Sequence, residues 1–536
     1  MVPTDDVDVD ARTDATIDRA ASTGPPHDVI ARRRVSPRTV DLAIFGLYAL
    51  VVGITIWQHE MWRDELQAWT LTNSATDLRD LFHDLRYEGH PSLWYLVLFP
   101  FTRLTDAPEA MQLLQFVIAL VTGGLVLRFS PFTQLQRAML LFGYFIVFEY
   151  GTMSRSYGLG MLLTFAVCAV ANRAQRVWWL IGSLIAAVAL TSAFGAMVAV
   201  AIATGLVTDE FVRRRSGDPR AASLQSIAFG ATIAIAGVLI AYAQSIPPSD
   251  VGEYRGWRTE IDLGEIASTV AALWRSFVPL PQLQREFWNT NLLDGRVGVA
   301  AVASVAIVVL VATTFRRKPA AIAMWLIGVS TMLVFLYAKI AYASSGRHFG
   351  HLFVLFVAMA WLAPSLAGLG RAPTSLEIDR RQSGSDAAEV RAALLTVVLG
   401  LHVVAGAFAV VSDWTTPFSD GERVADYLAE RDLADGIIIG YPDTSASTVA
   451  AYLDREIYFP QGDRFGNYIL WDADRADPTR PLSDVIEQFV EGEAPGVVIL
   501  RTEPLETLPP RVRLVAVFDR GIVSDEHYWL YAVERA

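Results

Sequence analysis

Residues 58–69 read QHEMWRDELQAW, and residues 86–95 read RYEGHPSLWY. These two charged and aromatic stretches follow a long apolar run at about 40–57 and precede a series of other apolar runs. Charged groups beside a bilayer are costly to keep unless polar chemistry takes place there. The sequence therefore predicts a membrane protein with a polar site next to the bilayer.

The composition is typical of a polytopic membrane protein. Of the 536 residues, 53% are hydrophobic and 19% are charged, and the mean hydropathy is +0.35. The single cysteine, Cys168, lies in an apolar run, which leaves no disulfide framework and no cysteine-based zinc site. The net charge of -12 lies mostly in the N-terminal tail and the C-terminal region, and no basic stripe suited to nucleic acid is present.

The apolar runs predict about eleven transmembrane helices, because each run is near the length that crosses about 30 Å of hydrocarbon. The predicted spans are 40–57, 110–128, 137–153, 157–172, 177–190, 192–207, 223–244, 297–314, 320–341, 348–369 and 392–411. The apolar stretch 92–104 is expected to lie on the membrane surface or to re-enter, since a further crossing there would place several Arg-rich loops outside.

Three regions follow from these patterns. Residues 1–38 are polar and acidic and predict a disordered cytoplasmic tail. Residues 39–411 form the predicted transmembrane domain, with outer loops at 58–91 and 245–296. In residues 412–536 helical and strand patterns alternate, which predicts a small extracytoplasmic α/β domain. Its strands are expected at 436–441, 496–501, 512–518 and 527–533.

Carboxylates and arginines on the predicted outer side are the first candidates for chemistry. Asp64 and Glu65 could take a proton from an acceptor hydroxyl or bind a divalent cation, Mg²⁺ or Mn²⁺, although a solvated loop or a helix N-cap also explains them. Arg155 and Arg347 suit a phosphate group, because a guanidinium donates two parallel hydrogen bonds. An internal ion pair of Arg155 with Glu149 is the alternative.

Histidine and aromatic residues complete the candidate site. His90 either donates to a phosphate or only marks a helix entry, and His348 could assist at the same phosphate. His348 and His351 alone are too few ligands for zinc, so these histidines predict no metal site. Trp62 is a sugar-stacking or interfacial residue, and Trp257 lies in an outer loop long enough to act as a lid. The candidate acceptor- and sugar-binding residues are Trp62, Glu88, Tyr157 and Trp257.

Three short segments resemble the GT-C superfamily of membrane glycosyltransferases, in particular the bacterial branch related to protein O-mannosyltransferases and lipid A aminoarabinose transferases. They are RDE at 63–65, GHPSLWY at 89–95, which is similar to a Lys-Pro-Pro-Leu-Tyr-type segment, and SRSYGLG at 154–160. The detailed similarity is confined to roughly the first 160 residues. The chain departs from the pattern at His90, where relatives often carry lysine, and at Ser92.

The resemblance implies a transferase that takes a sugar from a polyprenyl-phosphate donor and passes it to a cell-envelope glycan, lipid or protein. Asp64, with Glu65 beside it, would be the catalytic carboxylate, and Arg155 would bind the lipid phosphate. The chemistry agrees, since a lipid phosphate leaving group needs positive charge, and a single displacement with inversion needs no second carboxylate as nucleophile.

Two other classes stay open. A transporter or lipid flippase would carry polar groups near the bilayer midplane and paired broken helices, whereas the charged residues here cluster at the ends of the apolar runs. A non-enzymatic envelope scaffold, whose C-terminal domain binds a partner, is the third hypothesis.

Overall fold

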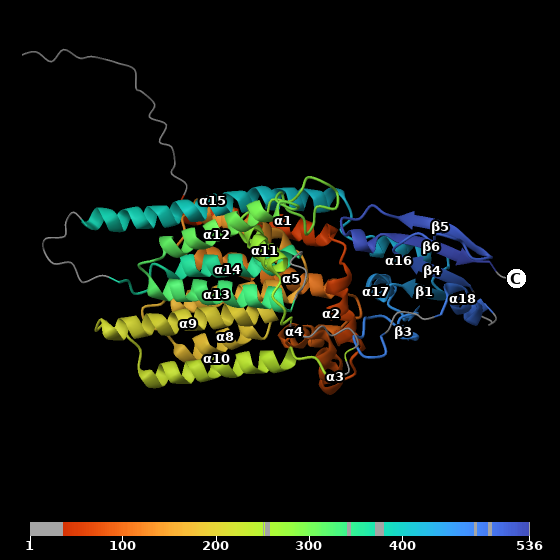
Figure 1. Cartoon of the computed structure of the whole chain (residues 1–536), viewed down its shortest axis with the longest axis horizontal. Coiled ribbons are helices and arrows are strands. Elements are labelled where there is room, and N and C mark those ends of the chain that lie inside the picture. The colour runs from red at the N-terminus through yellow and green to blue at the C-terminus, as the bar shows by residue number, and fades with distance from the viewer. Residues whose placement is uncertain are drawn as a thin grey trace, which may run out of the picture.

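A bundle of apolar helices carries a sheet domain at one end (Figure 1). The computed structural model describes residues 36–249, 251, 258–339, 345–369, 380–475, 480–490 and 496–534. In this part of the chain seven helices are long and apolar enough to cross a membrane. They are α1 (Pro37–Gln58), α5 (Glu109–Phe129), α9 (Ala193–Arg215), α10 (Leu224–Gln244), α12 (Val297–Thr314), α13 (Pro319–Ala338) and α15 (Arg380–Thr415).

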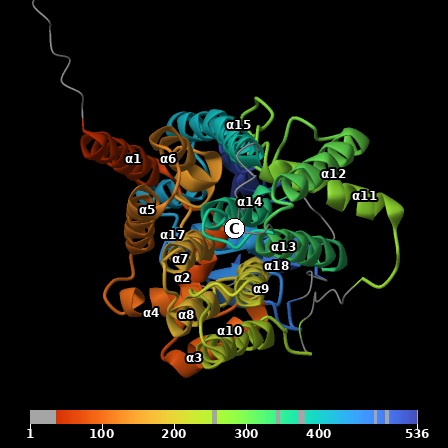
Figure 2. The same cartoon turned by 90° about the vertical axis from the view of Figure 1, so that its left-hand side faces the viewer.

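Shorter apolar helices complete the bundle, namely α7 (Ser156–Ala171), α8 (Trp178–Ala189) and α14 (Gly346–Leu362). Helix α14 is central, with the other helices around it (Figure 2). Nearly every side chain from Phe349 to Leu362 is buried, as expected for a helix that is apolar on all sides. The polytopic helical fold predicted from the sequence is confirmed.

The predicted span 137–153 is wrong in one respect, because it is not a continuous helix. Helix α6 (Gln134–Leu141) ends early, and a π-helical turn, η1 (Phe145–Glu149), follows. There the Tyr150 N–H donates to the Phe145 carbonyl, five residues back, which widens the turn. The apolar pattern continues through the break, so the sequence alone gives no sign of it.

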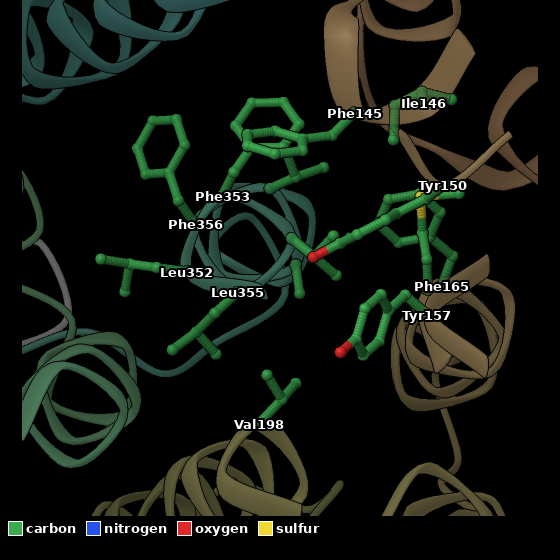
Figure 3. Close-up of a cluster of buried hydrophobic side chains, with 14 of the residues drawn as sticks. Phe145, Ile146, Tyr150, Tyr157, Phe165, Val198, Leu352, Phe353, Leu355 and Phe356 are labelled. Atoms are coloured by element: carbon green, nitrogen blue, oxygen red, sulfur yellow. The ribbon is translucent and has the colours of Figure 1, made fainter. Parts of the chain in front are cut away.

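The η1 turn packs against the central helix. The rings of Phe145 and Phe353 lie 5.7 Å apart, and those of Tyr150 and Tyr157 lie 5.6 Å apart (Figure 3). The Tyr150 hydroxyl also hydrogen-bonds the backbone carbonyl of Arg347. This aromatic cluster therefore holds the starts of α7 and α14, which carry Arg155 and Arg347, against each other.

The apolar stretch 92–104 forms helix α4 (Leu93–Thr102). Ten residues rise only about 15 Å, half of the hydrocarbon thickness, so α4 does not cross. It lies with α2 (Arg63–Ser74) and α3 (Leu78–Glu88) at the sheet end of the bundle (Figure 1). Between α3 and the end of α5, only α5 of the described helices is long enough to cross, which agrees with the single crossing predicted for this stretch.

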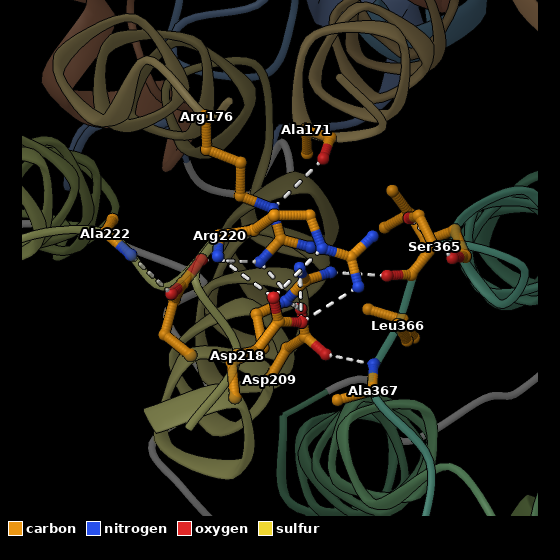
Figure 4. A network of polar contacts seen from close by, with 12 residues as sticks. Ala171, Arg176, Asp209, Asp218, Arg220, Ala222, Ser365, Leu366 and Ala367 are labelled. Atoms are coloured by element: carbon orange, nitrogen blue, oxygen red, sulfur yellow. Dashed lines mark hydrogen bonds and ion pairs between the residues drawn. The ribbon is translucent and has the colours of Figure 1, made fainter. Parts of the chain in front are cut away.

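A buried ion network lies near the C-terminal end of α9 (Figure 4). Asp209 accepts from the Nε of Arg213 at 2.7 Å and from the backbone N–H of Ala367 at 2.6 Å, and it contacts Arg176 at 2.7 Å. Glu210 contacts Arg176 at 3.0 Å. These pairs join the α7–α8 loop, α9 and the segment after α14 at the bundle end farthest from the sheet (Figure 1).

The C-terminal region is an α/β unit with a six-stranded mixed sheet in the order β3-β2-β1-β4-β6-β5. Its strands are β1 (Ile437–Tyr441), β2 (Ile457–Phe459), β3 (Arg464–Gly466), β4 (Val497–Arg501), β5 (Val512–Phe518) and β6 (Tyr528–Val533). Strand β1 pairs in parallel with β2 and β4, and the other pairs are antiparallel.

Three helices pack on this sheet. The core around Val424 and Val449 joins α16 (Gly421–Glu430) and α17 (Asp443–Tyr452) to the sheet, and a separate core around Val485 and Ile486 joins α18 (Leu482–Val490) to it. The predicted α/β class is confirmed, whereas β2 and β3 were not predicted, because three-residue strands are too short to show alternation.

Candidate active site

Helix α2 begins at a buried carboxylate. Glu65 accepts the Trp62 N–H at 3.3 Å, as in a capping box, and it also accepts the Ser154 N–H. Its third contact is with the Nε2 of His59 at 3.1 Å, and the Nδ1 of His59 lies 3.1 Å from Asp413. Glu65 is fully buried. The catalytic role predicted for Glu65 is therefore unsupported, since its position fits a residue that fixes the start of α2.

The adjacent residue, Asp64, lies among three arginines. It forms an ion pair with Arg155, and its carboxylate lies 3.0 Å from Arg347 and 3.2 Å from the Nε of Arg63. Burial by itself would raise the pKa of Asp64, but the charges of these three arginines outweigh burial and hold the pKa well below its ordinary value. Asp64 is therefore ionised and, in this arrangement, a weak base.

Arg155 does not form the alternative ion pair with Glu149. Instead Glu149 accepts hydrogen bonds from the Tyr144 hydroxyl at 2.8 Å and from the Trp288 indole at 3.1 Å. Arg155 lies at the N-cap of α7, with its guanidinium 5.3 Å from the centre of the Tyr157 ring. It is therefore held by one carboxylate and one aromatic face, beside the opening described next.

A cavity of about 340 Å³ opens at Asp64, between the bundle and the sheet domain. This volume is within the range of about 300–1,000 Å³ that is common for small-molecule sites. Of the predicted site residues, Asp64, Glu88, His90 and Arg155 line it. Its other lining residues are Arg63, Gln67, Ala68, Trp94, Tyr95, Ser156, Thr191, Thr444, Ile469 and Trp471.

Glu88 is the last residue of α3 and the second carboxylate of the cavity. Its Oε1 accepts a hydrogen bond from the Gln67 amide at 2.8 Å. Burial raises the pKa of Glu88 to about 7, against the smaller opposing effect of the Gln67 hydrogen bond. Glu88 thus gains or loses a proton near neutral pH, in contrast to Asp64.

His90 follows Glu88 closely and donates from Nδ1 to the Glu88 backbone carbonyl at 2.8 Å. Burial, together with the charge of Arg155, lowers the pKa of His90 to about 4. His90 is therefore neutral near pH 7. A neutral imidazole offers a phosphate at most a hydrogen bond, so the positive charge of the cavity comes from arginine.

Several predicted residues lie near the cavity without lining it. Trp62 is buried, with its ring 4.6 Å from that of Trp288 and 5.1 Å from the guanidinium carbon of Arg347. It supports Arg347, and its burial leaves no face for a sugar. Tyr157 is also buried, with its ring edge-on to His351 at 5.0 Å. The sugar-binding role predicted for these two aromatic residues is unsupported by their positions.

Arg347 reaches Asp64 from behind the cavity wall and does not line the cavity itself. His348 stacks on Phe194, with 4.7 Å between ring centres, and likewise lies outside the lining. Trp257 lies outside the described residues. The four predicted lining residues and Arg347 therefore form one connected group, while His348 does not join it.

The sequence did not predict that the C-terminal region contributes residues to the cavity. Thr444 at the start of α17, Ile469 and Trp471 close the cavity from the sheet side. The Gln67 amide donates to the Ile469 carbonyl at 2.8 Å and accepts the Ile469 N–H at 2.9 Å. Gln67 follows Asp64 by three positions on α2, a spacing that places both on one helix face and could have indicated it.

An apolar groove of about 790 Å³ adjoins the cavity. It lies along α9, α10 and α13, where Val200, Val238 and Val334 are among its lining residues. Glu88 and Trp471 line both the groove and the cavity. The cavity and the apolar groove therefore meet at these two residues.

Within the described ranges, no group of three or more His, Cys, Asp or Glu side chains gathers in a way that could hold a metal ion. The Asp64 carboxylate, which was the candidate cation ligand, faces arginines instead.

No family model and no curated protein matches the chain. Among solved structures, a crystal structure of ArnT from Cupriavidus metallidurans bound to undecaprenyl phosphate is 12% identical, covers 92% of this chain and 97% of that chain, and has a TM-score of 0.49. A cryo-electron microscopy structure of the arabinofuranosyltransferase AftD from mycobacteria is 13% identical, covers 94% and 42%, and has a TM-score of 0.30. Both TM-scores lie below 0.5, so the site rests on its own geometry.

Proposed function

We propose that this protein is a membrane glycosyltransferase of the GT-C type, which moves a sugar from a polyprenyl-phosphate donor to an acceptor of the cell envelope. One observation carries the proposal, namely the meeting of an arginine-rich cavity with an apolar groove at Glu88 and Trp471. A lipid with a phosphate head and a long hydrocarbon tail matches both parts. The same activity is implied by the sequence resemblance.

The proposed donor phosphate lies against Arg155, with Arg347 behind it. These arginines face Asp64, whose carboxylate holds their positive charge in a fixed position. Such preorganised charge stabilises the lipid phosphate as it leaves the sugar. An acceptor hydroxyl attacks the opposite face of the sugar carbon, which inverts its configuration. The donor is a hexosyl or pentosyl polyprenyl phosphate, and the acceptor is a glycan, lipid or protein.

The proposed membrane orientation places the sheet domain and the cavity outside the cytoplasm. Basic residues gather at the opposite end of the bundle, where Arg213 at the end of α9, Arg176 and Lys318 lie. The segments that carry them are brought together by the ion network in Figure 4 and by the hydrogen bond from Lys318 to the Leu366 carbonyl. By the positive-inside rule this end is cytoplasmic, and so is the N-terminus.

A transporter or flippase is less well supported. Substrate sites in that class lie near the bilayer midplane, between broken helices. Here Asp64, Arg155 and Arg347 all lie at helix ends, under the sheet domain.

The test is transfer of labelled sugar by the full chain in proteoliposomes. A panel of undecaprenyl phosphates that carry mannose, glucose, arabinose or aminoarabinose serves as donors, and envelope extracts serve as acceptors. We expect at least one donor to be consumed with release of undecaprenyl phosphate. The Asp64→Asn variant should lose about 100-fold or more of this rate, a loss typical of removing a key group from an active site.

The matched control is Asp80→Asn, which changes a carboxylate hydrogen-bonded to Thr76 on the surface of α3. It should keep the wild-type rate. If no donor of the panel is consumed, and if undecaprenyl phosphate does not bind, the proposed function is wrong. Addition of EDTA, followed by Mg²⁺ or Mn²⁺, tests the predicted divalent cation separately, because the arginines can supply the positive charge themselves.

A further inference from the structure

The two carboxylates that line the cavity lie in opposite surroundings. Asp64 faces three arginines. Glu88 receives one neutral hydrogen bond from the Gln67 amide at 2.8 Å and another from the Tyr95 hydroxyl. It is also the C-terminal residue of α3, where the partial negative charge of the helix end disfavours a carboxylate anion. A carboxylate held by neutral groups keeps its affinity for a proton, while one paired with arginines loses it.

We propose that Glu88 is the residue that takes the proton from the acceptor hydroxyl, and that Gln67 is the positioning residue that holds the Glu88 carboxylate in the cavity. This inference rests on the proposed function and refines it, because the sequence reading assigned the base to Asp64 and gave Glu88 an acceptor-binding role. Asp64 then serves to hold Arg155 and Arg347 in place for the phosphate.

The charged and titratable groups around Glu88 agree with this assignment. On α2 it faces Asp64, whose negative charge raises its pKa, and from the start of α7 it faces Arg155, whose positive charge lowers it. Tyr95 lies on α4, His90 is neutral, and Lys339 after α13 lines the groove on the other side. Burial is the largest effect and raises the pKa of Glu88; with these smaller effects of either sign the value is about 7, which suits a general base near neutral pH.

The transfer step balances with this base. The acceptor oxygen forms a bond to the anomeric carbon of the sugar, and the bond from that carbon to the phosphate oxygen breaks, with its electron pair leaving on the phosphate. The hydroxyl proton passes to the ionised Glu88 carboxylate. The products are the glycosylated acceptor, polyprenyl phosphate and protonated Glu88, which then releases its proton to solvent.

Gln67 links this base to the sheet domain. The Gln67 amide donates to the Glu88 carboxylate and to the Ile469 carbonyl, and it accepts the Ile469 N–H. Ile469 is two residues before Trp471, which closes the cavity. The segment of Ile469 and Trp471 therefore both closes the cavity and fixes Gln67, which orients Glu88. Glu88 is thus held in position when this segment closes the cavity.

The first test identifies the protonated carboxylate without any donor. Dicyclohexylcarbodiimide reacts with protonated carboxyl groups, and peptide mass spectrometry of the full chain locates the label. We expect Glu88 to be labelled with a midpoint near pH 7, and Asp64 to stay unlabelled down to pH 5. Labelling is repeated with undecaprenyl phosphate bound, because a phosphate competes with Asp64 for the arginines. Labelling of Asp64 instead of Glu88 in either state overturns the assignment.

The second test uses the transfer assay over a range of pH. In the wild-type protein kcat should rise with pH to a plateau, with a midpoint near the pKa of Glu88, since only the ionised carboxylate accepts a proton. Glu88→Gln should lower kcat by about 10²- to 10⁴-fold and remove this dependence, while undecaprenyl phosphate still binds. Glu88→Asp should recover part of the rate. Gln67→Leu should shift the midpoint of the pH profile.

The matched control is Glu60→Gln. Burial also raises the pKa of Glu60 to about 7, but Glu60 accepts from the Phe418 N–H and lies outside the cavity lining. This variant should keep the wild-type pH profile. Glu88→Gln with a kcat within threefold of wild type would disprove the base, whereas consumption of no donor by the wild-type protein would count against the proposed function. Carbodiimide labelling tests the Glu88 assignment in either case.

Discussion

At the scale of single residues, Arg155 and Arg347, two of the three arginines that face Asp64, differ in position. Arg155 lines the cavity, whereas Arg347 lies behind it, against the rings of Trp62 and Trp288 at 5.1 and 5.8 Å. Both carry the planar guanidinium that binds a phosphate through two donors. Because only Arg155 of these two lines the cavity, we expect a bound phosphate to contact Arg155 before Arg347.

Replacement of these arginines one at a time should reveal that order. We expect Arg155→Lys to raise the donor KM by about 10-fold, because lysine cannot reproduce a two-donor contact. Arg347→Lys should change the donor KM less and lower kcat more, since Arg347 acts through Asp64. Donor titrations of both variants in proteoliposomes measure this, and a larger KM effect at Arg347 would contradict the geometry.

Only some of the residues that form the site could be predicted from the sequence. Asp64, Glu88 and Arg155 were predicted from their residue types, because carboxylates and an arginine on the predicted outer side suit phosphate and proton chemistry. The sequence could not show that Asp64 lines the cavity while Glu65 is buried against His59. The rotation of α2 about its axis decides which way each side chain faces. Trp471 and Ile469 were missed for another reason, because Ile469 meets Gln67 across 402 positions of the chain.

At the scale of elements, helix α2 depends on the sheet domain. Glu526 accepts the Arg63 N–H at 2.7 Å, which satisfies a free donor at the start of α2. Its carboxylate also accepts from the Thr448 hydroxyl at 3.0 Å and from Ser419. Burial, and then the charge of Asp525, raises the pKa of Glu526 to about 7. One buried carboxylate of the sheet domain therefore connects to the helix that carries Asp64.

This raised pKa predicts a pH dependence of stability. The folded protein holds the Glu526 proton more tightly than the unfolded chain, whose ordinary value is 4.5. The contribution of Glu526 to the free energy of unfolding is thus full below pH 4.5 and is lost as the pH rises through about 7. Glu526→Gln should reduce the fall in Tm between pH 5 and pH 8, measured by intrinsic fluorescence.

The fall in Tm should not vanish in that variant, because Glu60 and Glu88 titrate over the same range. Glu503→Gln, at an exposed carboxylate of the same domain, is the control and should keep the wild-type dependence. An unchanged fall in Tm in Glu526→Gln would contradict the buried link.

The ion network at the far end of the bundle is a second contact between elements. Asp209→Asn leaves Arg176 and Arg213 without their shared buried partner, and removal of one partner from a buried ion pair costs about 3–5 kcal/mol. We expect a large fall in Tm and in the amount of folded protein in membranes. Asp218→Asn should change stability by less than about 1 kcal/mol, because its nearest partner, Arg220 at 2.8 Å, is exposed, and its contact with Arg213 is longer, at 3.6 Å. Similar losses in the two variants would refute the buried role of Asp209.

At the scale of the whole molecule, the division into a helical bundle and a C-terminal α/β unit could be predicted from the sequence. The long apolar spans and the alternation in 412–536 predicted a helical bundle and an α/β unit, because length and periodicity are local properties. The η1 break in 137–153 and the short strands β2 and β3 could not be predicted, since tertiary packing determines where they form. The sequence also could not predict that the cavity and the groove meet, because residues far apart in the chain, Glu88 and Trp471, line both.

The groove predicts a preference for long lipid chains. Val238 on α10 lines the groove, while the next residue, Leu239, is 61% exposed on the outside of the bundle. Val238→Trp should fill part of the groove and raise the KM for a donor with a 55-carbon prenyl chain, with little effect on a 10-carbon donor. Leu239→Trp should leave both KM values unchanged. Equal effects of the two variants would show that the tail lies elsewhere.

The proposed function requires that the cavity at Asp64 receives the phosphate of a membrane lipid. Its most direct test is the binding of undecaprenyl phosphate to the full chain, compared with undecaprenol, which has the same tail and no phosphate, and repeated with Arg155→Gln. We expect the wild-type protein to prefer the phosphate form by at least about 10-fold, a difference of about 1.4 kcal/mol, and Arg155→Gln to lose this preference. Equal binding of the two lipids, or an unchanged preference in Arg155→Gln, would contradict it.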